Sequence, residues 1–301
     1  MTTTGFIGVG TMGRPMARHV LAAAQPDDRV VLNALSPNGL EELLDAGARY
    51  ASNAREVAQQ CDVVVYMVPT MADIRGTLDG PDGLLAGLTP APLLLIVSST
   101  CSSAEVRDLA RDLDEATGGR IAVVDAPVSG GAEGAEAGTL SVMVGGADAD
   151  ATRAVGLLSA TGRAVHLGPL GAGQIAKACN QLIVAAEVVA NAEAAVLAER
   201  SGMDVSLLFD LLLDGYATSR IMEVKSPRFI AHDHSPSGPA KFLVKDLRAF
   251  AEEAERVGMT TFSVEPLRAV FTGLTQAGLG DQDSSVVQAY IEQSDGKAPS
   301  A

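Results

Sequence analysis

An apolar run that leads into a glycine-rich turn opens the chain, as Gly5-Phe6-Ile7-Gly8-Val9-Gly10-Thr11-Met12-Gly13. This Gly-x-Gly-x-x-Gly pattern is significant because it follows a predicted strand and precedes a predicted helix. The first glycine permits a tight turn, the second lets the backbone approach a pyrophosphate, and the third allows close packing of helix on strand. The sequence therefore predicts a dinucleotide site at Gly8, Gly10, Thr11, Met12 and Gly13. The alternative is a tight turn that binds nothing.

Outward from this stretch, short apolar runs alternate with helical patterns. We expect strands at residues 5–9, 30–33, 62–68, 93–98, 121–125, 140–144 and 164–167. Helices are expected at 12–24, 39–46, 53–60, 103–117 and 148–159. Such alternation indicates βαβ units and a mostly parallel sheet with helices on both faces. The fold class is therefore α/β, with an N-terminal Rossmann-like dinucleotide-binding domain.

The pattern changes after Gly168-Pro169. An Ala-rich segment without helix breakers runs from Gln174 to Arg200, and the rest reads as helices. We expect domains at 1–165 (NAD(P)-binding) and 166–293 (all-helical, for substrate and oligomerisation), with a flexible tail at 294–301. A long interdomain helix enters the second domain. Its Ala-rich surface favours close packing, so a homodimer or homotetramer is expected.

Composition excludes several classes of protein. The formal net charge of −15 disfavours nucleic acid and anionic membranes as partners, because both need clustered Lys or Arg. Three widely spaced cysteines indicate neither a disulfide framework nor a zinc site, so no metal is expected. The longest apolar run, residues 183–198, is interrupted by Glu187, Asn191 and Glu193. We expect a cytoplasmic protein without a membrane span.

The end of the second strand bears on which dinucleotide is bound. An acidic residue there accepts hydrogen bonds from ribose hydroxyls, whereas an Arg pairs with a 2′-phosphate. This chain has Asn33-Ala34-Leu35-Ser36, which contains neither. Asn33 can still bond a ribose hydroxyl, and no Lys or Arg stands close by in the sequence. NAD is therefore favoured over NADP.

Three further segments carry residues suited to chemistry. Asp125-Ala-Pro-Val-Ser-Gly-Gly131, continuing to Leu140, predicts a loop whose amides can approach a small anion. Lys177, Asn180 and Gln181 share one helix face, where an ammonium and carboxamides can hold a hydroxyl and a carboxylate. Lys245-Asp246-Leu247 is a charged pair amid apolar residues. By itself, each segment also has a simpler interpretation. The three are, in order, a plain turn, a solvated lysine on an amphipathic helix and a surface salt bridge.

Together the motifs resemble the β-hydroxyacid dehydrogenase family over essentially the whole chain. Residues 5–17 are similar to its cofactor signature, 125–140 to its substrate signature, 171–180 to its catalytic helix, and 245–247 to its cofactor-proximal segment. The resemblance implies an NAD(P)-dependent oxidoreductase of small 3-hydroxy acids or their semialdehydes, of the 3-hydroxyisobutyrate or tartronate semialdehyde type.

The resemblance also implies a role for individual residues. Lys177 would be the catalytic acid and base, and Ser129, Gly130, Gly131 and Asn180 would bind the substrate carboxylate. Asn33, Val68, Pro69, Thr100 and Lys245 would contact the cofactor, with Asp246 holding Lys245 in place.

The chain departs from the family pattern at Asn33, at Gly238, where many relatives have an aromatic residue, and at Gln181. Two alternatives remain open. One is a 6-phosphogluconate-type dehydrogenase, which carries Lys-x-x-His-Asn where this chain has Lys177-Ala-Cys-Asn180. The other is a non-catalytic dinucleotide sensor, against which the intact Lys177 argues.

Overall fold

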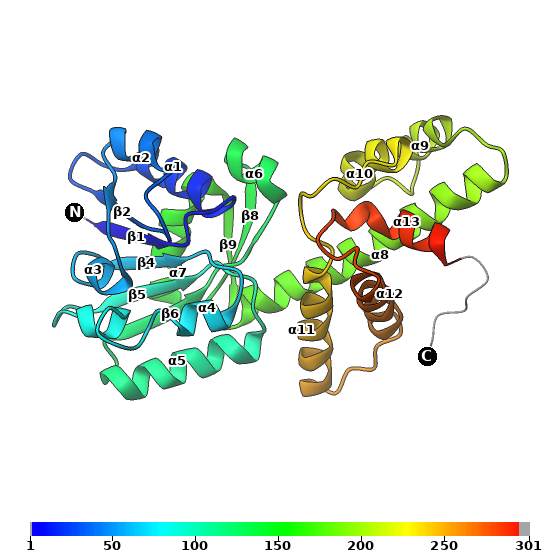
Figure 1. Ribbon diagram of the computed structural model, residues 1–301. Helices are drawn as coiled ribbons and strands as arrows, with labels where there is room; N and C mark the ends of the chain where they lie inside the picture. The colour runs from blue at the N-terminus through cyan, green and yellow to red at the C-terminus, as the bar shows by residue number, and fades with distance from the viewer. Residues whose placement is uncertain (1, 295–301) are drawn as a thin grey trace. The chain divides into compact units, whose positions relative to one another are not determined.

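A computed structural model describes residues 2–294 of the chain (Figure 1). Its contacts divide the chain into two compact units after Lys177. The first unit is α/β and the second is helical, as the sequence predicts. The boundary expected near residue 165 stays a prediction, and the tail expected at 294–301 lies, from residue 295, outside the described residues.

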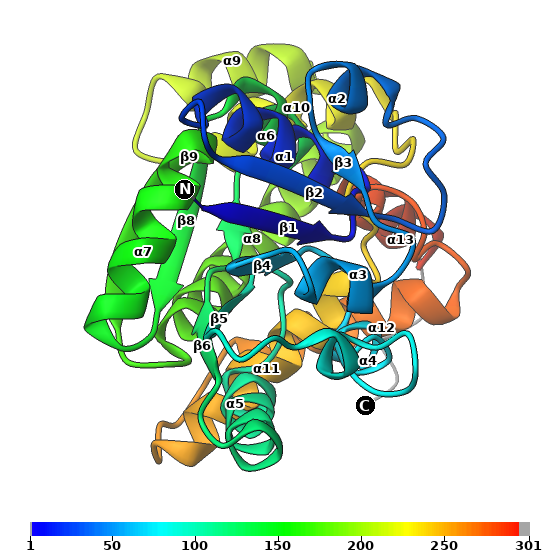
Figure 2. The same cartoon turned by 90° about the vertical axis from the view of Figure 1, so that its left-hand side faces the viewer.

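A nine-stranded sheet forms the centre of the first unit (Figure 2). Its strands are β1 Thr3–Ile7, β2 Arg29–Asn33, β3 Arg49–Tyr50, β4 Val63–Tyr66, β5 Leu93–Val97, β6 Ile121–Asp125, β7 Val128–Ser129, β8 Leu140–Gly145 and β9 Gly162–Gly168. They are ordered β3-β2-β1-β4-β5-β6-β8-β7, with β9 beside β8. The first six in this order pair in parallel, whereas β8 is antiparallel to β6 and β7. The 3-2-1-4-5-6 order is that of a Rossmann sheet.

Helices cover both faces of this sheet because its strands present apolar side chains to both. These helices are α1 Gly13–Ala23, α2 Glu41–Asp45, α3 Ala54–Ala58, α4 Met71–Arg75, α5 Ser103–Thr117, α6 Gly131–Ala137 and α7 Asp148–Leu158. On one face, Phe6 and Val65 pack with Met16 of α1. On the other, Val64 and Tyr66 pack with residues of α3 and α5. The carboxyl ends of β1, β4 and β5 are therefore fixed by two apolar cores.

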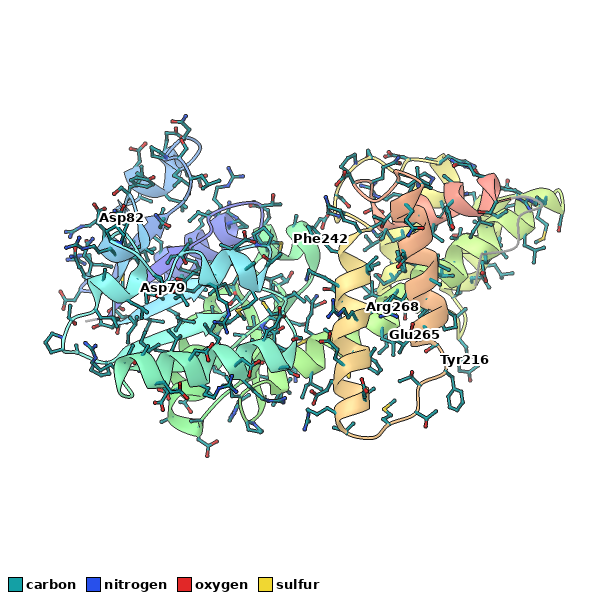
Figure 3. The ribbon with its side chains drawn as sticks, turned by 60° about the horizontal axis from the view of Figure 1, so that its bottom comes forward. Asp79, Asp82, Tyr216, Phe242, Glu265 and Arg268 are labelled. Carbon is teal, nitrogen blue, oxygen red and sulfur yellow. The ribbon has the colours of Figure 1, made fainter. Side chains whose placement is uncertain are left out.

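The second unit contains most of α8 Ala172–Arg200, with α9 Val205–Leu213, α10 Arg220–Ala231, α11 Phe242–Arg256, α12 Val264–Gln276 and α13 Val287–Gln293. Its core includes Phe209, Phe229 and Phe271. Figure 3 labels Glu265 and Arg268 on α12, which form an ion pair of 2.6 Å. By length and composition alone α8 is apolar enough to cross a membrane, a property that core helices of soluble proteins share.

The segment 125–140, predicted as a loop, contains regular structure instead. Strand β7 and helix α6 both lie within it. Gly130 and Gly131 adopt φ angles of 136° and 66°, which turn the chain before α6, and Gly138 ends the helix at φ 68°. The Ala and Glu residues between these glycines are good helix formers. The expectation of a loop over residues 125–140 was therefore wrong for residues 131–137, which form α6.

Candidate active site

The glycine-rich turn between β1 and α1 has the geometry that its sequence predicts. Gly8 adopts φ 94°, and a Cβ there would collide with the carbonyl oxygen of Met67. A Cβ on Gly13 would collide with the carbonyl oxygen of Gly8, so only glycine lets α1 begin this close to the turn. A Cβ on Gly10 would meet nothing within 4 Å. The space beside Gly10 is thus open to a ligand.

A cavity of about 300 Å³ lies at this turn. It is bounded by the loop after β1, the start of α1, the loop after β2 and helix α6. The lining residues are Val9, Gly10, Thr11, Arg14, Ala34, Ser36, Asn38, Gly39, Leu40, Ala132 and Glu136. Helix α1 begins beside it without a side-chain cap, so its first N–H groups are suited to an anion. These features fit a dinucleotide. Gly10 and Thr11 line the cavity, while Gly8, Met12 and Gly13 support the turn.

Asn33 does not line this cavity. Its side-chain Nδ2 donates to the carbonyl oxygen of Ala51, 2.9 Å away, which attaches the amide nitrogen to the chain after β3. The role of Asn33 at a ribose hydroxyl stays a prediction, with Oδ1 as the atom suited to accept such a bond.

The predicted cofactor residues Val68 and Thr100 lie in adjacent loops. The backbone N–H of Val68 donates to Ser99 Oγ at 3.0 Å, which ties the loop after β4 to the loop after β5. Pro69 follows Val68. Gln174 bonds both sides of Thr100, because its Nε2 donates to the Ser99 carbonyl and its Oε1 accepts from Cys101 N–H. The start of α8 is thereby attached to the Thr100 loop.

Asp125, at the end of β6, makes the second attachment of α8. Its two carboxylate oxygens accept the backbone N–H groups of Gly171 and Gln174, each at 2.7 Å. Burial raises the pKa of Asp125 to about 6, and the two N–H donors act against this rise. No separate role for Asp125 is predicted from the sequence. A carboxylate that ends a buried strand just before a glycine-rich turn was the available signal.

Lys177 lies on α8 one turn beyond these attachments, with 8% of its surface exposed. Asn180 follows one turn later, and its Nδ2 donates to Gln181 Oε1 at 3.0 Å. Gln181 Nε2 in turn donates to Asp246 Oδ2 at 2.6 Å. Buried Asp246 also pairs with Lys245 at 2.8 Å, which is the contact that the sequence predicts. A hydrogen-bonded chain thus connects Lys245 through Asp246 and Gln181 to Asn180 within the second unit.

Ser129, Gly130 and Gly131 join β7 to α6. Helix α6 is anchored on α1, because Arg18 and His19 both bond the carbonyl oxygen of Glu136. This anchoring brings Ala132, next to Gly131, to the cavity that Gly10 and Thr11 line. The predicted substrate signature and the predicted cofactor turn therefore meet within the first unit.

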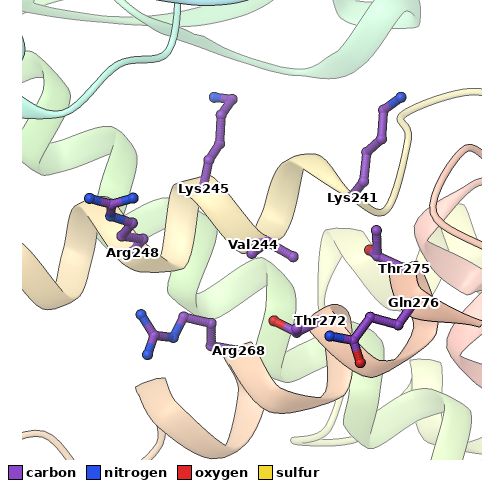
Figure 4. Close-up of a pocket in the computed structure, with 8 residues that line it drawn as sticks. All are labelled: Lys241, Val244, Lys245, Arg248, Arg268, Thr272, Thr275 and Gln276. Carbon is purple, nitrogen blue, oxygen red and sulfur yellow. The ribbon is translucent and has the colours of Figure 1, made fainter.

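A second cavity, of about 540 Å³, lies between α11 and α12 (Figure 4). It is lined by Lys241, which precedes α11, by Lys245 and Arg248 of α11, and by Arg268, Thr272, Thr275 and Gln276 of α12. Each of the four cations is paired with a carboxylate, at 2.5–2.8 Å. The positive charge of this cavity is therefore largely balanced.

Known proteins match the chain in both units. Residues 3–169 match the NAD-binding domain of 6-phosphogluconate dehydrogenase, and residues 171–291 match a domain described as the NAD-binding domain of NADP-dependent 3-hydroxyisobutyrate dehydrogenase. An NAD-dependent L-serine dehydrogenase of Pseudomonas aeruginosa is 34% identical over 99% of this chain and 100% of its own. The 2-hydroxy-3-oxopropionate reductase of Escherichia coli is 33% identical over 96% of both chains.

A solved structure agrees with these sequence matches. The 3-hydroxyisobutyrate dehydrogenase of Salmonella typhimurium superposes with a TM-score of 0.85 at 30% identity, over 96% of this chain and 100% of that one. The chain therefore belongs to the β-hydroxyacid dehydrogenase family of NAD(P)-dependent oxidoreductases.

Proposed function

We propose that this enzyme moves a hydride between a nicotinamide dinucleotide and a small 3-hydroxy acid or its semialdehyde, with Lys177 as proton donor and acceptor. The observation that carries the proposal is a buried lysine on a helix whose start is held at two points. Asp125 and Gln174 fix the first turn of α8, so Lys177 projects from a rigid support. Precise placement of a single acid or base is what proton transfer at a reacting oxygen requires.

In the reductive direction, Lys177 Nζ donates a proton to the substrate carbonyl oxygen, and in the oxidative direction it removes the hydroxyl proton. Ser129, Gly130 and Gly131 bind the substrate carboxylate, and Asn180 orients it. Gly8, Gly10, Thr11, Met12 and Gly13 hold the dinucleotide at one end, and Val68, Pro69, Thr100 and Lys245 hold it further along. The bound cofactor supplies the hydride chemistry.

The names of the relatives support the substrate class. Their names specify L-serine, 3-hydroxyisobutyrate or 2-hydroxy-3-oxopropionate, and all three are short carboxylates with an oxygen on the third carbon. Within a chain of net charge −15, a carboxylate needs local N–H donors, which the Ser129–Gly131 segment supplies. A small carboxylate is therefore the substrate we propose.

The test is NAD- and NADP-linked turnover in both directions on a panel of 3-hydroxyisobutyrate, 3-hydroxypropionate, glycerate, serine and 4-hydroxybutyrate with their semialdehydes. For Lys177→Ala we expect kcat/KM to fall by about 10²–10⁴-fold, the usual contribution of a general acid or base. Dinucleotide affinity should stay within about twofold, because Lys177 acts on the substrate. Cys179→Ala, an exposed change on the same helix, is the matched control.

Tight dinucleotide binding without turnover of any panel member would favour the sensor instead. Retention of full activity in Lys177→Ala would refute the role of this lysine.

We further propose that the enzyme is cytoplasmic and a homo-oligomer. Exposed apolar side chains of the helical unit support the second statement, with Leu207 and Leu211 about 70% exposed.

A further inference from the structure

We infer that Arg14, with Ser36 and Asn38, forms a phosphate subsite for the 2′-phosphate of NADP, so that the enzyme prefers the phosphorylated dinucleotide. This inference rests on the proposed function only in placing a dinucleotide in the cavity beside Gly10. It reverses the preference for NAD that the residues around Asn33 suggest by themselves.

The cavity lacks an available carboxylate among the described residues. NAD enzymes of this fold hold the ribose hydroxyls with an acidic side chain at the end of the second strand. Here that position is Asn33, whose amide is bonded to Ala51. Glu136 lines the cavity but pairs with Arg18 at 2.8 Å. Glu41, the first acid after β2, accepts the N–H of Gly39 in its own loop.

The cavity is also lined by a cationic side chain, that of Arg14. Arg14 is exposed in the first turn of α1, and its guanidinium makes no hydrogen bond or ion pair with any described residue. Its backbone N–H bonds Gly10 at 3.0 Å, which fixes the base of the side chain beside the turn. A guanidinium offers several N–H donors in a planar arrangement that matches phosphate oxygens.

Residues with neutral donors line the same cavity. Ser36 Oγ accepts the N–H of Asn38 at 3.1 Å, which leaves the hydroxyl proton of Ser36 to be donated. Asn38 and Thr11 line the cavity as well, and their side chains carry an amide and a hydroxyl. A dianion placed there meets one cation and three neutral donors, which is a set suited to phosphate rather than to a ribose hydroxyl.

The sequence alone does not predict that Arg14 and Ser36 line the same cavity. The two residues follow different strands, but β1 and β2 pair in parallel, with Ile7 opposite Asn33. Their carboxyl ends therefore lie at the same edge of the sheet, and the loops that follow them share one cavity.

The test measures binding rather than turnover, on the full-length protein at fixed ionic strength. NADPH and NADH are titrated by nucleotide fluorescence, and adenosine 2′,5′-bisphosphate and 5′-AMP by calorimetry. The wild type should bind the 2′-phosphorylated member of each pair about 10-fold tighter or more, as expected for a charge-assisted hydrogen bond. Arg14→Gln should remove about 10-fold of the NADPH affinity and change NADH affinity by less than about twofold.

Arg49→Gln is the matched control, since it removes the same charge from an exposed residue of the same unit that does not line the cavity. Ser36→Asp provides a second variant: its carboxylate should repel the 2′-phosphate, reversing the preference towards NADH. A wild type that binds NADH as tightly as NADPH would overturn the inference. Equal losses for both dinucleotides in Arg14→Gln would assign Arg14 to the pyrophosphate instead. Absence of turnover would count against the proposed function and leave this binding ratio unaffected.

Discussion

At the scale of single residues, Gly238 is informative because of the space around it. Many relatives of this family carry an aromatic residue seven positions before the lysine of the Lys-Asp-Leu motif, and this chain carries Gly238 there. A Cβ at Gly238 would meet nothing within 4 Å, and the residue is exposed with an ordinary φ. A larger side chain is therefore tolerated by the fold.

We expect Gly238→Phe to narrow the substrate range without loss of stability. The added ring restores bulk where this chain is open, so KM should rise for the longer or branched members of the panel and change little for the shortest. A Tm within about 2 °C of the wild type and unchanged NADPH affinity are the controls, since a surface substitution usually costs less than about 0.5 kcal/mol. If Gly238→Phe leaves the KM of every panel member as it is in the wild type, position 238 does not contact the substrate.

At the scale of elements, hydrogen bonds to Asp283 link α10 to the segment before α11 and to the segment before α13. Its fully buried carboxylate accepts Lys225 Nζ at 2.6 Å, the hydroxyl of Ser237 and the N–H of Ser285. Burial by itself raises the pKa of this carboxyl, but the hydrogen bonds from Lys225, Ser237 and Ser285 outweigh it and lower the pKa to about 2. The charged form is therefore stabilised by folding.

A pH dependence follows from this lowered pKa. Asp283 contributes stability that is present above its ordinary pKa of 3.8 and is lost as the pH falls towards 2. Asp283→Asn should lower the free energy of unfolding by about 2 kcal/mol at pH 7, and the difference from the wild type should shrink between pH 4 and 2. Urea unfolding at several pH values measures it. Asp281→Asn, which breaks the exposed pair with Lys241, should cost less than about 1 kcal/mol. A deficit independent of pH would contradict the assignment.

At the scale of the whole molecule, α9 presents two faces of different character. Val205 and Phe209 are buried in the helical core, whereas Leu207 and Leu211, one turn apart, are 68% and 71% exposed. Met203 and Tyr216, on either side of α9, are also exposed. An apolar patch of this kind is typical of a protein interface, which supports the proposed homo-oligomer.

We expect the mass in solution to be a multiple of 30.9 kDa, measured by light scattering after gel filtration. Leu207→Asp combined with Leu211→Asp should shift the protein towards a monomer, because buried carboxylates without partners disfavour an interface. Val257→Asp, at a 57% exposed position that ends α11, is the control for a general loss of solubility. A wild type that is monomeric at micromolar concentration would refute the proposal.

The sequence by itself determined the features that depend on local backbone and periodicity. The apolar strands and the helices from 103 to 117 and from 172 onward follow from the spacing of their side chains. The roles of Gly8 and Gly13 follow from conformations and contacts that only glycine permits. The family signatures, including Lys177 and Lys245-Asp246, are equally local, because each lies within a few residues.

Tertiary structure alone decided which of these local pieces meet. The hydrogen bonds of Asp125 and Gln174 that fix α8 join residues more than forty positions apart in the chain. The commitment of Asn33 to Ala51, and the presence of Arg14 in the cavity that Ser36 lines, were likewise not visible in the sequence. The physical reason is that side-chain spacing specifies each strand and helix, whereas the parallel order of the strands determines which of their following loops lie together.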